Sequence, residues 1–130
     1  MADDLRVLVE QLKAVAHPLR LRVLALLGGG EYCVCQIAEV VQAPQSSISE
    51  TLRELRRAGF TRERKEGRWV LVSLLPETDA PPLLRALLMQ AEALPEALRD
   101  RARAAEVRAL PLPIVCGRRT QEALAGGPHE

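Results

Sequence analysis

The sequence predicts a mainly α-helical domain that carries one small β-hairpin. Three observations support this prediction. Apolar residues recur at helical spacing along most of the 130 residues, glycine and proline divide the chain into short segments, and the periodicity of a strand follows residue 59. Hydrophobic residues make up 48% of the sequence and charged residues 27%, a balance typical of a globular protein and not of a disordered one.

The first part of the chain predicts four helices. The first, at about residues 3–16, places aspartates in its first turn, where the helix dipole favours them. The second, at residues 18–27, begins at a proline, is apolar on most sides and ends at three glycines. A third helix at about residues 34–41 and a fourth at about 45–58 are separated by a short turn. Two short helices joined in this way indicate a helix-turn-helix.

Two short strands are expected next. Residues 60–65 and 68–74 flank Glu66-Gly67, a two-residue loop with glycine where a positive φ is favoured. A hairpin with basic residues at its tip, directly after a helix-turn-helix, is typical of a wing, so the predicted fold is a winged helix-turn-helix. A fifth helix is expected from the prolines at 81 and 82 to about residue 94.

Two parts and a homodimer are predicted. Residues 1–94 form the winged helix-turn-helix domain for DNA binding and dimerisation, and residues 95–130 form a C-terminal helical extension and tail that carries Cys116. The apolar stripes of the first and fifth helices are expected to lie outside the compact unit, and such stripes bury against a partner. The predicted interface residues are Leu5, Leu8, Leu12, Leu84, Leu87 and Leu88.

Basic side chains gather in one window of a sequence whose charges otherwise balance. Residues 51–68 hold seven basic and three acidic side chains, whereas the whole chain carries a formal net charge of +1. A local basic stripe is the electrostatic footprint of phosphate contact, although a solvated helix face with ion pairs gives the same pattern. Aromatic residues are only 2% of the chain, which argues against binding nucleic acid by base stacking.

The order of these elements and three stretches of sequence resemble the ArsR/SmtB family of metal-responsive winged-helix repressors. The stretches are AHPLRLRVL at residues 16–24, EYCVCQIA at 31–38, and QSSIS at 45–49 with its continuation to Ala58-Gly59-Phe60. The resemblance covers about residues 12–94. It implies a homodimer that binds double-stranded operator DNA, blocks transcription and releases the DNA when metal binds.

By position in this family, the fourth helix enters the major groove, where short hydroxyl and amide side chains allow close approach to base edges. The residues expected to face DNA from this helix are Gln45, Ser46, Ser47, Ser49, Glu50 and Arg53. Backbone phosphates are expected to contact Arg62, Arg64, Lys65 and Arg68 on the wing. The chain departs from the family at Glu50-Thr51, where members often carry histidines, and this departure bears on the operator sequence.

Cys33 and Cys35 are the candidate metal ligands. Their Cys-Val-Cys arrangement resembles the inducer site of arsenical-resistance repressors, although cytosolic cysteines are often only small buried hydrophobes. Residues two apart on a regular helix point in nearly opposite directions, so joint ligation needs an irregular first turn. A helix N-terminus lowers the pKa of a thiol, and thiolates select soft ions.

The resemblance implies trivalent arsenic or antimony as the inducer, bound by three thiolates. Ala38 stands where arsenical sensors often place their third cysteine, so Cys116 is the remaining candidate, in cis or across the dimer. The only histidines are His17 and His129, and the fifth helix contains none. The zinc and cobalt site of the family is therefore not expected.

Several other functions would use some of the same residues. A cadmium or lead sensor, and a thiol-based redox sensor with Cys116 as the resolving cysteine, would keep the same fold. A thiol-disulfide enzyme would need strands that alternate with helices, and the glycines at 28–30 lack the residues of a phosphate-binding loop, so no enzyme is predicted. The apolar runs are too short for a membrane span or a signal peptide, and a cytoplasmic protein with free thiols is expected.

Overall fold

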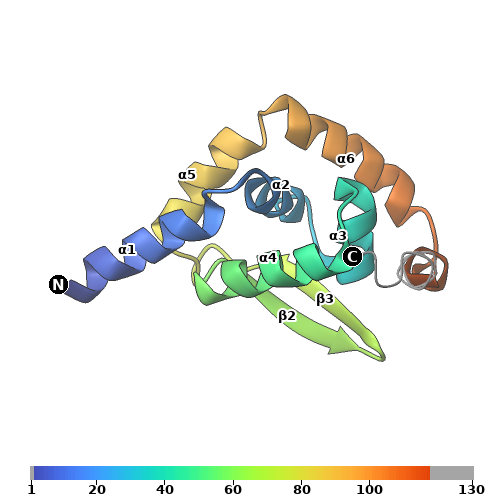
Figure 1. Cartoon of the computed structure of the whole chain (residues 1–130), viewed down its shortest axis with the longest axis horizontal. Coiled ribbons are helices and arrows are strands. Elements are labelled where there is room, and N and C mark those ends of the chain that lie inside the picture. The colour runs from blue at the N-terminus through green and yellow to red at the C-terminus, as the bar shows by residue number, and fades with distance from the viewer. Residues whose placement is uncertain (1, 118–130) are drawn as a thin grey trace.

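The computed structural model describes residues 2–117, so His129 lies outside the described residues. In chain order the elements are α1 (Ala2–Val15), α2 (Pro18–Leu27), β1 (Tyr32–Cys33), α3 (Val34–Val41), α4 (Gln45–Arg57), β2 (Thr61–Glu66), β3 (Trp69–Leu74), α5 (Pro82–Ala91) and α6 (Pro95–Arg108) (Figure 1). Residues 112–117 are also helical. The predicted fold class, mainly helical with a small sheet, is confirmed.

Helix α2 is the centre of the fold, and α1, α3, α4, α5 and α6 all pack against it (Figure 1). It begins at Pro18, directly after His17, whose Nδ1 accepts a hydrogen bond from the Leu19 N–H at 3.2 Å. This contact satisfies one of the free donors at the helix N-terminus. The largest fully buried side chains are Phe60, Leu24, Ile37, Ile48, Leu55, Val23, Val40, Val72 and Val115.

Helices α3 and α4 form the predicted helix-turn-helix. Gln42 ends α3 in the left-handed conformation (φ 56°), and its side-chain amide donates to the Glu39 carbonyl at 2.7 Å. Ile48 and Leu55 of α4 are fully buried, so this face of the helix is fixed to the core. Each such side chain contributes about 1.5–3 kcal/mol by its burial. The opposite face of α4 is therefore held in a defined orientation toward solvent.

The three strands form one antiparallel sheet in the order β1-β3-β2. Glu66 pairs with Trp69, so the hairpin loop is Gly67-Arg68 and the predicted Glu66-Gly67 loop is wrong by one residue. Gly67 has φ +61°, so the glycine does supply the positive φ, but at the first loop position. Strand β1 was not predicted, because its two residues are too short to show a period.

Helix α5 ends at Ala91 and not at the predicted residue 94, because Leu94 is the N-cap of α6. The prediction that the stripe of the fifth helix lies outside the compact unit is wrong for Leu84, which packs in the core with 3% of its surface exposed. Leu87 and Leu88 are half-buried against the same core. By contrast Leu5, Leu8 and Leu12 on α1 are exposed.

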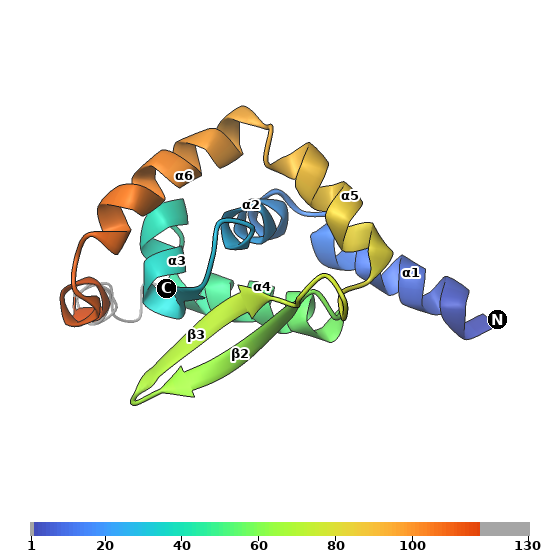
Figure 2. The ribbon, with the colours of Figure 1, turned by 180° about the vertical axis from the view of Figure 1, so that it is seen from behind.

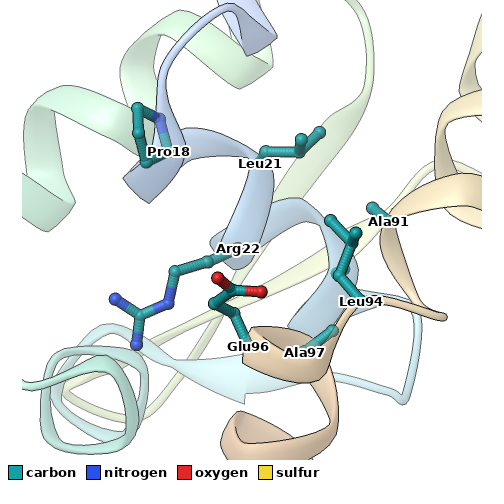
Figure 3. A pocket seen from close by; sticks show the side chains of 8 residues that line it. Pro18, Leu21, Arg22, Ala91, Leu94, Glu96 and Ala97 are labelled. Carbon is teal, nitrogen blue, oxygen red and sulfur yellow. The ribbon is translucent and has the colours of Figure 1, made fainter.

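The bend between α5 and α6 leaves a shallow, mostly apolar hollow against α2. Figure 3 shows Pro18, Leu21, Ala91, Leu94 and Ala97 around it, with the polar ends of two charged side chains at one side. No cysteine lines this hollow. Among residues 2–117, none of the helices has the length and apolar character that a membrane span requires.

Candidate metal centre and nucleic-acid interface

The structure brings the three cysteines together. Cys33 ends β1, Cys35 lies in the first turn of α3, and Cys116 comes from the helical segment that follows α6. Their sulfur atoms all lie within 4.8 Å of one another, and the Sγ atoms of Cys33 and Cys116 are 3.8 Å apart. Figure 2 shows the segment after α6 on the same side of the molecule as α3.

Cys33 and Cys35 converge because Cys33 is not part of the helix. It occupies the N-cap position of α3 with an extended backbone (φ −80°, ψ 156°). The side-chain Oε1 of Gln36 accepts a hydrogen bond from the Cys33 N–H at 2.9 Å and holds this geometry. The expected irregularity is therefore the boundary between β1 and α3. Because Cys33 lies outside the helix, its side chain does not have to point away from that of Cys35, as it would on one regular helix.

The three thiols differ in acidity because they interact with one another. The pKa of Cys33 is lowered to about 6, chiefly because the Cys35 thiol donates to it and also because backbone N–H groups at the start of α3 do. The same hydrogen bond raises the pKa of Cys35, and burial raises that of Cys116 to about 11. At neutral pH the cluster therefore holds one thiolate and two thiols.

The arrangement fits a soft metal or metalloid ion. Cys33 and Cys116 are buried, and the apolar side chains of Leu71, Trp69 and Leu112 pack around them. Two thiolates that share one ion at a bond length of about 2.3 Å lie no more than about 4.6 Å apart. The Cys33 and Cys116 sulfurs, 3.8 Å apart, are within this limit, and a donor set of sulfur alone selects soft ions.

The predicted DNA-contacting residues lie on α4 and on the hairpin. Figures 1 and 2 place both elements on the side of the molecule opposite the α5–α6 bend. On α4, Ser47 is half-buried, and the exposed predicted residues are Gln45, Ser46, Ser49, Glu50 and Arg53. On the hairpin all four predicted residues are exposed, namely Arg62, Arg64, Lys65 and Arg68. The two predicted groups therefore share one side of the molecule.

Two of the basic wing residues have partners within the chain. The Arg64 guanidinium binds the Glu31 carboxylate through two hydrogen bonds of 2.7 and 2.9 Å. The Arg68 guanidinium lies 4.4 Å from the centre of the Trp69 ring. Glu31 stands two positions before Cys33, and Trp69 packs on the thiol cluster. Both contacts therefore connect the wing with the surroundings of Cys33.

The sequence does not reveal the residues that lie far from Cys33 in the chain but close to it in the fold. Arg108 at the end of α6 donates from Nη2 to the carbonyl of Glu31 at 2.7 Å, and its guanidinium lies 3.9 Å from the centre of the Tyr32 ring. No local pattern indicates such a contact between residues 77 positions apart. The capping glutamine Gln36 follows Cys33 by three positions, which is the spacing of a capping box and a usable signal.

Comparison with known proteins identifies the family. Residues 17–62 match the sequence model described as bacterial regulatory protein, arsR family. The chain is 44% identical over 61 residues to the uncharacterized HTH-type transcriptional regulator MJ1325 of Methanocaldococcus jannaschii, a match that covers 46% of this chain and 68% of that protein. The chain belongs to the arsR family. This arsR-family protein is a DNA-binding transcriptional regulator with a winged helix-turn-helix fold.

The chain is also similar to a second curated protein and to a solved structure. The arsenical resistance operon repressor of Escherichia coli K12 is 36% identical over 73 residues, which cover 55% of this chain and 62% of that protein. The solved structure of reduced HlyU from Vibrio cholerae N16961 has a TM-score of 0.59 and 28% identity, and covers 71% of this chain and 92% of that one. Across five curated relatives the matched segment spans 46% to 68% of their length.

Proposed function

We propose that this arsR-family protein is a homodimeric repressor that releases its operator DNA when trivalent arsenic or antimony binds Cys33, Cys35 and Cys116. One observation carries the proposal. Three sulfur atoms from segments 83 residues apart in sequence lie within 4.8 Å of one another. Such convergence gives a three-coordinate ion its complete donor set from one chain.

The chemistry of the donors favours a trivalent metalloid. Thiolates prefer soft ions, and within residues 2–117 the cluster offers sulfur without histidine or carboxylate. The apolar side chains of Leu71 and Leu112 pack around Cys33 and Cys116, and such surroundings favour a site whose bound charge is small. A trivalent ion held by three thiolates is neutral, whereas a divalent ion held by the same three leaves a net negative charge. The similarity to an arsenical resistance operon repressor supports the same assignment.

The thiol cluster lies next to the elements proposed to bind DNA. The Cys35 thiol contacts Oε1 of Gln45 at 4.0 Å, and Gln45 is the first residue of α4. Cys33 pairs with Leu71 of β3, the central strand of the sheet that includes the wing. An ion that draws the three thiolates together therefore acts at once on the start of the proposed recognition helix and on the base of the wing.

Release needs only a difference in affinity between two conformations of the dimer. Two recognition helices must match operator half-sites about 34 Å apart, so a small shift at the start of α4 changes their spacing. An inducer that prefers the non-binding conformation by about 3 kcal/mol weakens DNA binding about 150-fold. The α1 residues Leu5, Leu8 and Leu12 are exposed and supply an apolar surface for the dimer.

The test is operator binding by fluorescence anisotropy during titration with arsenite under reducing conditions. A duplex selected from a random-sequence pool serves as the operator. Wild type, the double variant Cys33→Ser/Cys35→Ser and the single variant Cys116→Ser should bind DNA equally well without arsenite. Stoichiometric arsenite should release the wild type and leave both variants bound. Release of the double variant by arsenite would place the inducer site elsewhere.

A redox-sensing repressor is the second candidate, because the Cys33 and Cys116 sulfurs are already in contact at 3.8 Å. Peroxide would oxidise the Cys33 thiolate to a sulfenic acid, and attack by Cys116 would then form a disulfide and expel water. In the same assay a redox sensor would release DNA with peroxide alone and rebind it after reduction. Arsenite without peroxide would then have no effect.

A further inference from the structure

We infer that α6 and the segment after it form a strap that supplies Cys116 to the thiol site of its own chain, and that Arg108 positions this strap beside Cys33. The inference rests on the proposed three-thiolate site and adds the residues that hold the third thiol in place. Arg108 contacts the Glu31 carbonyl and the Tyr32 ring, so the role inferred for it is that of a positioning residue and not of a ligand.

Polar contacts attach the strap along its length. Asp100 of α6 is 5% exposed and accepts two hydrogen bonds from the Arg22 guanidinium of α2, at 2.8 and 3.0 Å. Nearer its C-terminal end, Arg103 donates to the Glu39 carbonyl of α3 at 3.1 Å. Ala104 and Val107, which follow these contacts along α6, are buried in the main core. The path of α6 over α2 and α3 is therefore fixed by both charge and packing.

Arg108 makes the last of these contacts, directly beside the thiol site. Its guanidinium donates to the Glu31 carbonyl and stacks on the ring of Tyr32, which is 4% exposed and immediately precedes Cys33. The short segment that follows Arg108 then returns to place Cys116 at 3.8 Å from Cys33. One side chain thus ties the end of α6 to the two residues before the first ligand.

The absence of a side chain at Gly30 leaves space for the Arg108 guanidinium. Gly30 has φ +140°, a conformation that other residues rarely adopt. A Cβ atom at this position would lie 2.7 Å from Nη2 of Arg108, closer than atoms in contact can approach. The glycine therefore supplies both the turn before β1 and the space that the Arg108 side chain occupies.

A thiol held in place before the ion arrives binds it more tightly, because no chain entropy is lost when the third bond forms. Without Arg108 the end of the strap is held by core packing alone, so part of its ordering falls at the moment of binding. Loss of a residue that orients a metal ligand typically weakens binding by about 10-fold to 100-fold. We therefore expect Arg108→Gln to weaken arsenite binding about 10-fold and to leave operator affinity without arsenite unchanged.

The first experiment is a double-mutant cycle read by the charge-transfer absorbance of arsenite bound to thiolates. Arsenite affinity is measured for wild type, Arg108→Gln, Cys116→Ser and the combination of both substitutions. Arg108→Lys tests rescue by a cation, and Arg101→Gln removes the same charge from an exposed position of α6. If Arg108 acts through Cys116, its substitution weakens binding only where Cys116 is present, and Arg101→Gln behaves as wild type.

Two outcomes of this cycle would overturn the inference. One is an Arg108→Gln protein with wild-type arsenite affinity, and the other is an equal loss of affinity in the Cys116→Ser background, which indicates a general structural effect. In either case arsenite still binds the wild type through thiolates, so the proposed function stands. A wild type that gives no charge-transfer absorbance overturns the proposed function itself.

The second experiment needs no arsenite and tests whether the strap acts in cis. In the Cys35→Ser background, diamide accepts two electrons and two protons while Cys33 and Cys116 form a disulfide. A product that migrates as a monomer on a non-reducing gel shows the pairing within one chain, and Arg108→Gln should slow its formation. A covalent dimer would show that Cys116 comes from the second subunit and would overturn the inference.

Discussion

The guanidinium of Arg64 and the carboxylate of Glu31 form a two-point ion pair, with N–O distances of 2.7 and 2.9 Å. Arg64 lies on β2 of the wing, and Glu31 lies just before Tyr32 and Cys33. A residue proposed to contact DNA phosphate is thus bound to the segment that carries the proposed metal site. Operator phosphate must compete with Glu31 for the same guanidinium.

Removing this competition should strengthen DNA binding. The Glu31→Gln protein loses one negative charge beside the wing, and Arg64 loses this ion-pair partner. Operator affinity should therefore rise about threefold to tenfold. The slope of log affinity against log salt concentration should become steeper by about one, because one more phosphate contact releases about one more counterion. Anisotropy titrations at several salt concentrations measure both quantities. Glu77→Gln is the control, because Glu77 pairs with Arg85 at 2.7 Å outside the wing. An unchanged salt slope would show that Arg64 does not reach phosphate.

Arsenite affinity should depend on pH with a break near the pKa of Cys33. Arsenous acid releases three waters when it binds three thiols, so a thiolate already present requires the uptake of one proton. Because the pKa of Cys33 is lowered to about 6, affinity should be constant below pH 6 and fall about 10-fold per pH unit above it. Competition titrations from pH 5 to pH 8 measure this slope. A curve that stays level up to pH 8 would show that Cys33 titrates as an ordinary thiol.

Stability should depend strongly on the contact between Arg22 and Asp100. The side chains are 33% and 7% exposed, so Asp100→Ala leaves a half-buried guanidinium without its partner and should cost about 2 kcal/mol in the free energy of unfolding. Glu77→Ala breaks an exposed ion pair with Arg85 and should change stability by less than about 0.5 kcal/mol. Urea denaturation compares the two. Equal effects would show that the contact on α6 contributes no more than a surface pair.

The proposed dimer should depend on the exposed face of α1. Leu8→Glu should give a folded monomer, because Leu8 is 44% exposed within its own chain, and operator affinity should fall about 100-fold when two half-sites are no longer linked. Sedimentation velocity measures the association. Leu98→Glu on α6, where Leu98 is 55% exposed, is the matched control and should remain dimeric. Dissociation by Leu98→Glu alone would instead place the interface beside the hollow of Figure 3.

The helices could be predicted because their signals are local. Pro18 and the three glycines bound α2, and the apolar period defines α3, so both helices have the predicted limits. The hairpin was predicted, but its loop was placed one residue too early because a glycine next to either strand end satisfies the same pattern. The two residues of β1 carry no period and become a strand only by pairing with β3.

The candidate site was predictable only in part, for the same reason. The Cys33 and Cys35 pair is recognisable from its motif, whereas the place of Cys116 depends on the path of α6 over α2 and α3. That path is set by long-range contacts such as those of Asp100 and Arg108, which no local pattern reveals. The sequence pattern also predicts that the fifth helix contributes to the dimer interface, although Leu84 is buried in the core of its own chain.

The position of Trp69 gives the protein an internal optical reporter. The chain contains one tryptophan and one tyrosine, and Trp69 packs against the thiol cluster while Tyr32 immediately precedes Cys33. Intrinsic fluorescence therefore originates almost entirely beside the three sulfurs. Occupation of the cluster, oxidation of its thiols and movement at the base of the wing all become observable in unlabelled protein.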